Sequence, residues 1–171
     1  MANLGVFRDD FYNAIHVLPA SQGTAGPTST GTLTAAMLTG ALENVITVGN
    51  GASTAQTYTT DTAVNIIAQI QAAVSAAYKA NVGGFASSLG AQPAIVWPNF
   101  FNVTWTVDIA NQGTTSASTL SAGTGVTLAY LNSGFTSGAG NLAVGTPNAP
   151  AITRWVVSVT SAQTITMTRV Q

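Results

Sequence analysis

The chain has 171 residues, a net charge of −1 and no cysteine, and only 5% of its residues are charged, against roughly a quarter in an ordinary soluble domain. This composition excludes disulfides and thiolate metal sites, and four Lys and Arg residues are too few to neutralise a nucleic-acid backbone. A surface this poor in charge does little to prevent association, so we expect the protein to work within an assembly.

Residues 1–57 predict an extended N-terminal arm. Residues 20–34 are rich in Gly, Ser, Thr and Pro, which is typical of a connecting segment. Before them lie large apolar side chains that we expect to anchor the arm in an interface, either on its own domain or on a neighbouring chain: Phe7, Phe11, Tyr12, Ile15 and Leu18. The leucine spacing within residues 33–42 is compatible with a short helix. The first residues lack the pattern of a signal peptide, and no apolar run is long enough to span a membrane.

A helix is predicted over about 60–81. Its apolar residues recur at steps of three and four, which places Val64, Ile67, Ile70 or Gln71, Val74 and Tyr78 on one face. Thr60 or Asp61 can cap its first turn, and Gly83 and Gly84 can end it.

From Ile95 onward the hydrophobic period changes from helical to alternating. Val103, Trp105, Val107 and Ile109 alternate with polar residues, which indicates a half-buried strand. Residues 123–125 read Gly-Thr-Gly and predict a turn, and residues 154–170 alternate on both sides of residues 161–163 as in a closing hairpin. The Gly-rich residues 132–150 predict a long loop that carries Phe135 and Leu142 outward or across a subunit boundary.

Together these patterns predict a mainly β, α+β fold. We expect a small antiparallel β-sandwich or barrel with one amphipathic helix over residues 58–171, preceded by the extended N-terminal arm. A chain of this length can bury such a core without metal or disulfide crosslinks.

The sequence offers no catalytic constellation, so we expect no enzyme, no cofactor and no metal. His16 is the only histidine and lies between Ile15 and Val17, which favours a structural role. The acids are Asp9, Asp10, Glu43, Asp61 and Asp108, and no spacing among them indicates an acid–base pair or a cation site. We expect Asp108 to pair with Arg154 or Arg169 and to fix strand register or an interface. The Gly-rich segments lack the spacing of phosphate-binding loops.

Four segments carry a resemblance to a known class of protein. They are the Ala-, Ile- and Gln-rich helix after Thr-Asp, the Trp-x-Val-x-Ile strand, TLSAGTGVTL, and the terminal RWVVSVTSAQTITMTRV. This arrangement, over roughly Thr57 to Gln171, resembles a pattern that recurs in structural proteins of tailed bacteriophages.

The resemblance implies a virion protein, and most closely a capsid decoration (cement) protein or the base of a head fibre. Such a protein is made in the bacterial host cytoplasm and binds the capsid exterior as a homotrimer. There it stabilises the shell by bridging major capsid proteins, and it has no active site.

Two other classes stay open. A phage tail or fibre component also has β-strand sequences rich in Thr, Gly and Ala. A carbohydrate-binding module could use Trp97, Trp105 and Trp155 as a sugar platform, although the pattern places Trp105 and Trp155 on inward faces.

Overall fold

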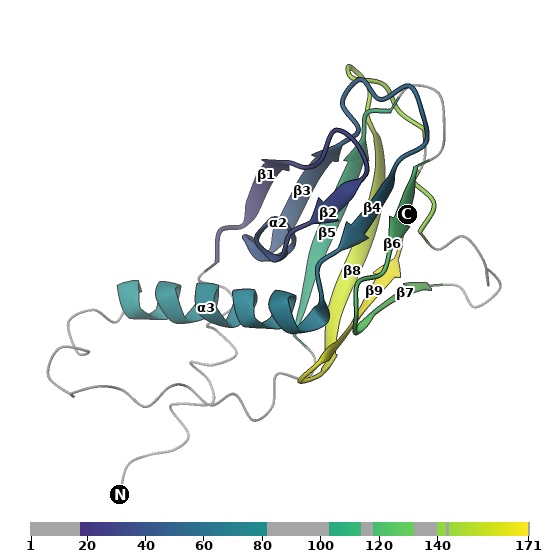
Figure 1. Ribbon diagram of the computed structural model, residues 1–171. Coiled ribbons are helices and arrows are strands. Elements are labelled where there is room, and N and C mark those ends of the chain that lie inside the picture. Colours follow the sequence, from purple (N-terminus) through teal and green to yellow (C-terminus); the bar gives the residue numbers. More distant parts are fainter. Residues whose placement is uncertain (1–17, 82–102, 114–117, 132–139, 143, 171) are drawn as a thin grey trace, which may run out of the picture.

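The computed structural model describes residues 18–81, 103–113, 118–131, 140–142 and 144–170, and for residues 73–81 it describes the backbone alone. These residues form two sheets and two helices (Figure 1). In chain order the elements are β1 (Ser21–Ala25), β2 (Gly31–Leu33), α2 (Ala35–Thr39), β3 (Glu43–Val48), β4 (Thr57–Thr60), α3 (Ala63–Asn81), β5 (Thr104–Asn111), β6 (Thr119–Ser121), β7 (Val126–Tyr130), β8 (Ala151–Ser161) and β9 (Thr164–Arg169).

The larger sheet has six strands in the order β1-β3-β5-β8-β9-β7, and the smaller has three in the order β2-β4-β6. This confirms the mainly β, α+β fold class. The prediction of a wholly antiparallel sheet was wrong, because the strands pair in both parallel and antiparallel directions. Only β5–β8 and β8–β9 are antiparallel, and the pairs β1–β3, β3–β5, β7–β9, β2–β4 and β4–β6 are parallel. Parallel neighbours need long crossover connections, so their pairing leaves no hairpin signal in the sequence.

One hydrophobic core lies between the two sheets and the helices. Alternate residues of β5 and β8 point into it, including Trp105, Val107, Trp155 and Val157, as the period-two pattern predicted. The smaller sheet contributes Leu33, Tyr58 and Leu120, so both sheets share the core. Figure 1 shows the smaller sheet and α3 on the same side of the six-stranded sheet.

The helix α3 confirms the prediction of a helix near 60–81, but the side chains that it buries differ in part from those predicted. Ala63, Ile66, Ile67 and Ile70 are buried, whereas Val64 is 52% exposed. The buried side is thus set by Ile66 and Ile70 together with Ile67, and Val64 falls outside it. The side chains of Val74 and Tyr78 lie outside the described residues. Thr62 caps the helix, because its hydroxyl accepts a hydrogen bond from the Asn65 amide at 3.2 Å.

The expectation of an extended arm does not describe residues 18–57. From Leu18 on, this segment contributes β1 and β3 to the large sheet, β2 to the small sheet and α2 to the core layer. Leu18 is 7% exposed and packs in the core, so it is not a free anchor of an arm. The arm residues 1–17 lie outside the described part of the chain.

The turn predicted at residues 123–125 is present, and it connects the two sheets. The Val126 amide donates to the Gly123 carbonyl at 3.0 Å, and Gly125 has φ 78°. This positive φ suits glycine, because an L side chain is strained there. The hairpin around residues 161–163 is confirmed by the antiparallel pairing of β8 and β9. Leu142, expected to point outward, is buried in the core.

Candidate functional site

The six-stranded sheet has one face that no described helix or strand covers. We call this the outer face: it is formed by the alternate side chains of β1, β3, β5, β8, β9 and β7 that point away from the core. One row across it is Gly23, Val45, Asp108 and Arg154, and the neighbouring row is Ser21, Glu43, Thr106 and Val156. Most of its other side chains are threonine, serine or alanine, so its charges are confined to one cluster of Glu43, Asp108 and Arg154.

Three of the nine charged residues of the chain meet at the centre of the outer face. Arg154 of β8 donates from Nε to Asp108 Oδ1 at 2.8 Å and from Nη2 to Asp108 Oδ2 at 2.6 Å, which makes a bidentate pair. The same Nη2 donates to Glu43 Oε1 of β3 at 2.7 Å. The Asp108 side chain is only 5% exposed, whereas those of Arg154 and Glu43 are 42% and 43% exposed. Arg154 therefore reaches across β5 to link three strands.

Hydrogen bonding to Asp108, and then its charge, raise the pKa of Arg154, so the guanidinium stays charged at every accessible pH. The pairing confirms the sequence-based expectation for Asp108 and selects Arg154 as the partner. Arg169 instead donates to the backbone carbonyl of Asn141 and lies over the Tyr130 ring at 6.0 Å. The sequence pattern did not indicate Glu43, because its approach depends on the parallel pairing of β3 with β5.

Exposed aliphatic side chains lie at one end of the same face. Ile152 on β8 is 48% exposed, Val170 after β9 is 37% exposed, and Leu131 after β7 is 73% exposed. The Val170 amide donates to the Arg154 carbonyl and the Leu131 amide to the Arg169 carbonyl, so both residues continue the sheet. Large apolar side chains left exposed together are typical of a surface that another protein covers.

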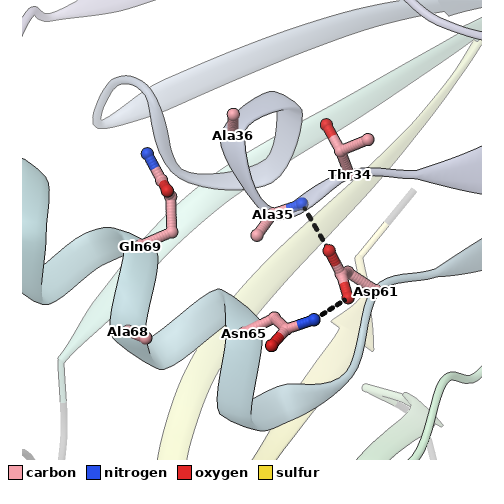
Figure 2. A pocket seen from close by; sticks show the side chains of 7 residues that line it. All are labelled: Thr34, Ala35, Ala36, Asp61, Asn65, Ala68 and Gln69. Atoms are coloured by element: carbon pink, nitrogen blue, oxygen red, sulfur yellow. Dashed lines mark hydrogen bonds between the residues drawn. The ribbon is translucent and has the colours of Figure 1, made fainter.

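A second feature is an open hollow of about 450 Å³ between α2 and the first half of α3 (Figure 2). It is lined by Thr34, Ala35, Ala36, Asp61, Asn65, Ala68 and Gln69. Asp61 lies at its base, where Oδ2 accepts from the Ala35 amide at 3.1 Å and Oδ1 accepts from the Thr62 amide at 2.8 Å and from Asn65 Nδ2 at 2.7 Å. Both carboxylate oxygens are thus engaged in joining the start of α2 to the start of α3.

Desolvation alone would raise the pKa of Asp61, but hydrogen bonds from Asn65, Thr62 and Ala35 outweigh it and hold the pKa below its usual value. The carboxylate is ionised at neutral pH, which makes it a structural acceptor and a poor general acid.

The other candidate residues divide into buried and undescribed ones. Trp105 and Trp155 are buried at 4% and 0% exposure, and Trp105 Nε1 donates to the Leu38 carbonyl at 2.6 Å, so neither ring is available as a sugar platform. Trp97, His16, Asp9 and Asp10 lie outside the described residues, as do the arm anchors Phe7, Phe11, Tyr12 and Ile15. Only Leu18 of the five anchors is described, and it belongs to the core.

The described residues contain no group of three His, Cys, Asp or Glu side chains placed to hold a metal ion. None of their helices is long and apolar enough to cross a membrane. No known protein family, curated protein or solved structure matches the chain.

Proposed function

We propose that this chain is a non-enzymatic structural protein of a virion, a decoration protein that binds the outside of a phage head and bridges major capsid proteins. The resemblance of residues 57–171 to structural proteins of tailed bacteriophages favours this role over the other classes.

The observation that carries the proposal is the outer face. It is a sheet surface whose charges are confined to the Glu43–Asp108–Arg154 cluster, with Ile152, Val170 and Leu131 exposed beside it. A freely diffusing protein keeps such surfaces apart through charge, and this chain has too little charge to do so. A protein that is permanently bound to other subunits does not need surface charge to prevent association.

The described carboxylates support a structural role. Glu43 and Asp108 are bound to Arg154, and Asp61 accepts three hydrogen bonds from the starts of the helices. The hydrogen bonds of these groups stabilise strand and helix positions.

Attachment to the shell is assigned to residues 1–17, whose apolar anchors Phe7, Phe11, Tyr12 and Ile15 can bury large apolar area in a neighbouring chain. Several arms acting together would add avidity. The truncation that tests this must begin at Leu18, because removal of residues up to 30 would also delete β1 and the core contact of Leu18.

The experiment mixes heads assembled without this protein with the full chain or with a variant lacking residues 1–17, and measures co-sedimentation and the position of added density by electron microscopy. We expect the full chain on the capsid exterior and no binding by the truncated chain. The double variant Phe7→Ala/Phe11→Ala should bind weakly, and the matched control Asn3→Ala/Asn13→Ala should bind like the full chain. Binding to tails, or no binding to heads, would overturn the proposal.

A further inference from the structure

The turn that follows β3 contains the only Asn-Gly dipeptide in the sequence, Asn50-Gly51. Both residues are exposed, and the turn is closed by a hydrogen bond from the Ala52 amide to the Gly49 carbonyl at 2.9 Å. Gly51 has φ 75°, and a Cβ on it would meet nothing within 4 Å. The side of the turn that carries Gly51 is therefore open to water.

The backbone amide of Gly51 has no hydrogen-bond partner among the described residues, and neither does the side chain of Asn50. A backbone nitrogen becomes a nucleophile only when it loses its proton, which a hydrogen bond to a carbonyl prevents. The Gly51 nitrogen is free of this restraint. It also follows Asn50 directly in the chain, at the spacing that closes a five-membered ring with the side-chain carbon Cγ.

The other asparagines whose side chains the structure describes each lack one of these conditions. Asn65 and Asn141 are exposed too, but the amide that follows each of them donates to a backbone carbonyl, at 3.0 and 2.8 Å. The same holds for Asn148, at 3.2 Å. Asn44 and Asn111 are fully buried. Of this set, only Asn50 combines an exposed side chain with an unbonded amide after it.

We propose that Asn50 is a site of spontaneous deamidation in the folded protein. Hydroxide removes the proton of the Gly51 amide, and the nitrogen attacks Cγ of Asn50. The new N–Cγ bond forms, the bond from Cγ to Nδ2 breaks, and ammonia leaves with a proton from water, which regenerates the hydroxide. The product of this step is a succinimide.

Water then opens the succinimide in one of two ways. Cleavage of the new bond between Cγ and the Gly51 nitrogen gives aspartate at position 50. Cleavage of the bond between the Asn50 carbonyl carbon and the same nitrogen gives isoaspartate, whose main chain continues through Cγ.

Both products change the charge of a chain that has few charges. The sequence has five acidic and four basic residues, so one further carboxylate takes the formal net charge from −1 to −2. Isoaspartate also adds one carbon atom to the main chain between Gly49 and Ala52, whose hydrogen bond closes the turn. This turn lies on the connection from β3 of the large sheet to β4 of the small sheet, so the modification alters a link between the two sheets.

The purified full chain tests the inference, independently of attachment to capsids. After incubation at mildly alkaline pH, proteolysis and mass spectrometry measure deamidation at each asparagine. We expect the peptide with Asn50 to gain about 1 Da and to contain isoaspartate, and the peptides with Asn65 and Asn141 to keep their mass. Hydroxylamine, which cleaves succinimides, should cut the incubated chain into residues 1–50 and 51–171.

Two variants test the mechanism. Asn50→Gln keeps the amide group but lengthens the side chain, so attack would close a less favoured six-membered ring, and residue 50 should keep its mass over the same period. Gly51→Ala places a methyl group beside the attacking nitrogen and should slow deamidation at least about tenfold. Asn65→Gln is the matched control and should leave the rate at Asn50 unchanged. Circular dichroism checks that the variants fold.

A further variant separates reaction in the folded turn from reaction in the unfolded chain. Asp61→Ala removes hydrogen bonds at the starts of α2 and α3, so it should increase the unfolded fraction and leave the rate at Asn50 unchanged. A rate that rises in Asp61→Ala would overturn the inference. An Asn50 peptide that keeps its mass, or an equal gain in the Asn65 and Asn141 peptides, would do so as well.

Discussion

The carboxylate of Asp61, just before α3, accepts a hydrogen bond from the backbone amide of Ala35, the first residue of α2, at 3.1 Å. Through its other oxygen Asp61 also accepts from Thr62 and Asn65 at the start of α3 (Figure 2). One side chain therefore satisfies free amides at the beginnings of two helices that are adjacent in space and distant in sequence.

Replacing Asp61 by alanine should lower the free energy of unfolding by about 1 to 3 kcal/mol, because three hydrogen bonds to a charged acceptor are lost. Urea unfolding followed by circular dichroism measures the change. Asn65→Ala removes only one of these hydrogen bonds and should cost less. Equal stability of Asp61→Ala and the unsubstituted chain would contradict the bridging role.

The same site predicts a pH dependence. The pKa of Asp61 is lowered in the folded state, so the unfolded chain takes up its proton first as the pH falls. The stability that Asp61 contributes is complete above the ordinary aspartate pKa of about 3.9 and is lost as the pH falls through the folded value. The difference in unfolding free energy between the unsubstituted chain and Asp61→Asn should thus be constant from pH 7 to about 5 and shrink below about 4. A difference that grows on acidification would contradict this assignment.

Substituting Gly125 and Gly51 separates the cost of backbone strain from the cost of steric overlap. Both have positive φ, 78° and 75°. A Cβ on Gly125 would lie 2.5 Å from the Gln163 carbonyl oxygen and 3.0 Å from Ala63 Cβ, whereas a Cβ on Gly51 would meet nothing within 4 Å. Gly51→Ala should cost about 1 kcal/mol from φ alone, and Gly125→Ala at least about 1 kcal/mol more from the overlap. Thermal unfolding of the two variants gives the order, and equal losses would show that the turn after β6 moves freely.

The sequence predicted those helices and strands that have a hydrophobic period or a turn motif within their own residues. The alternation in residues 103–109, the hairpin at residues 161–163 and the helix near 60–81 all have counterparts in β5, β8 with β9, and α3. The inward positions of Trp105 and Trp155 followed from period two alone.

What the sequence did not predict depends on contacts between distant segments. The short strand β1 lies in the Gly-, Ser- and Thr-rich residues 20–34, whose composition resembles a linker, and it becomes a strand by pairing with β3, which in turn pairs with β5. Glu43 joins Arg154 across 111 residues for the same reason. Burial of Leu142 and exposure of Val64 likewise depend on which surface each element packs against.

The bidentate pair of Arg154 and Asp108 predicts an ordered set of stabilities. Arg154→Met leaves the 5% exposed carboxylate of Asp108 without its cation and should lower the melting temperature by several degrees. Glu43→Gln keeps that pair and should have a smaller effect. The double variant Arg154→Met/Asp108→Asn removes the unpaired charge and should recover part of the loss. Calorimetry of the four proteins checks the order, and a double variant less stable than Arg154→Met would contradict the role assigned to the buried charge.

The two buried tryptophans differ in their indole nitrogens. Trp105 Nε1 donates to the Leu38 carbonyl at 2.6 Å, whereas Trp155 Nε1 has no partner in the described structure. Phenylalanine in either position removes the same atoms and leaves a similar void, but only Trp105→Phe also breaks a hydrogen bond. Trp105→Phe should therefore destabilise the protein by about 1 kcal/mol more than Trp155→Phe in urea unfolding. Because Trp155 is the more deeply buried of the two, burial alone predicts the opposite order, so the sign of the difference shows which effect is larger.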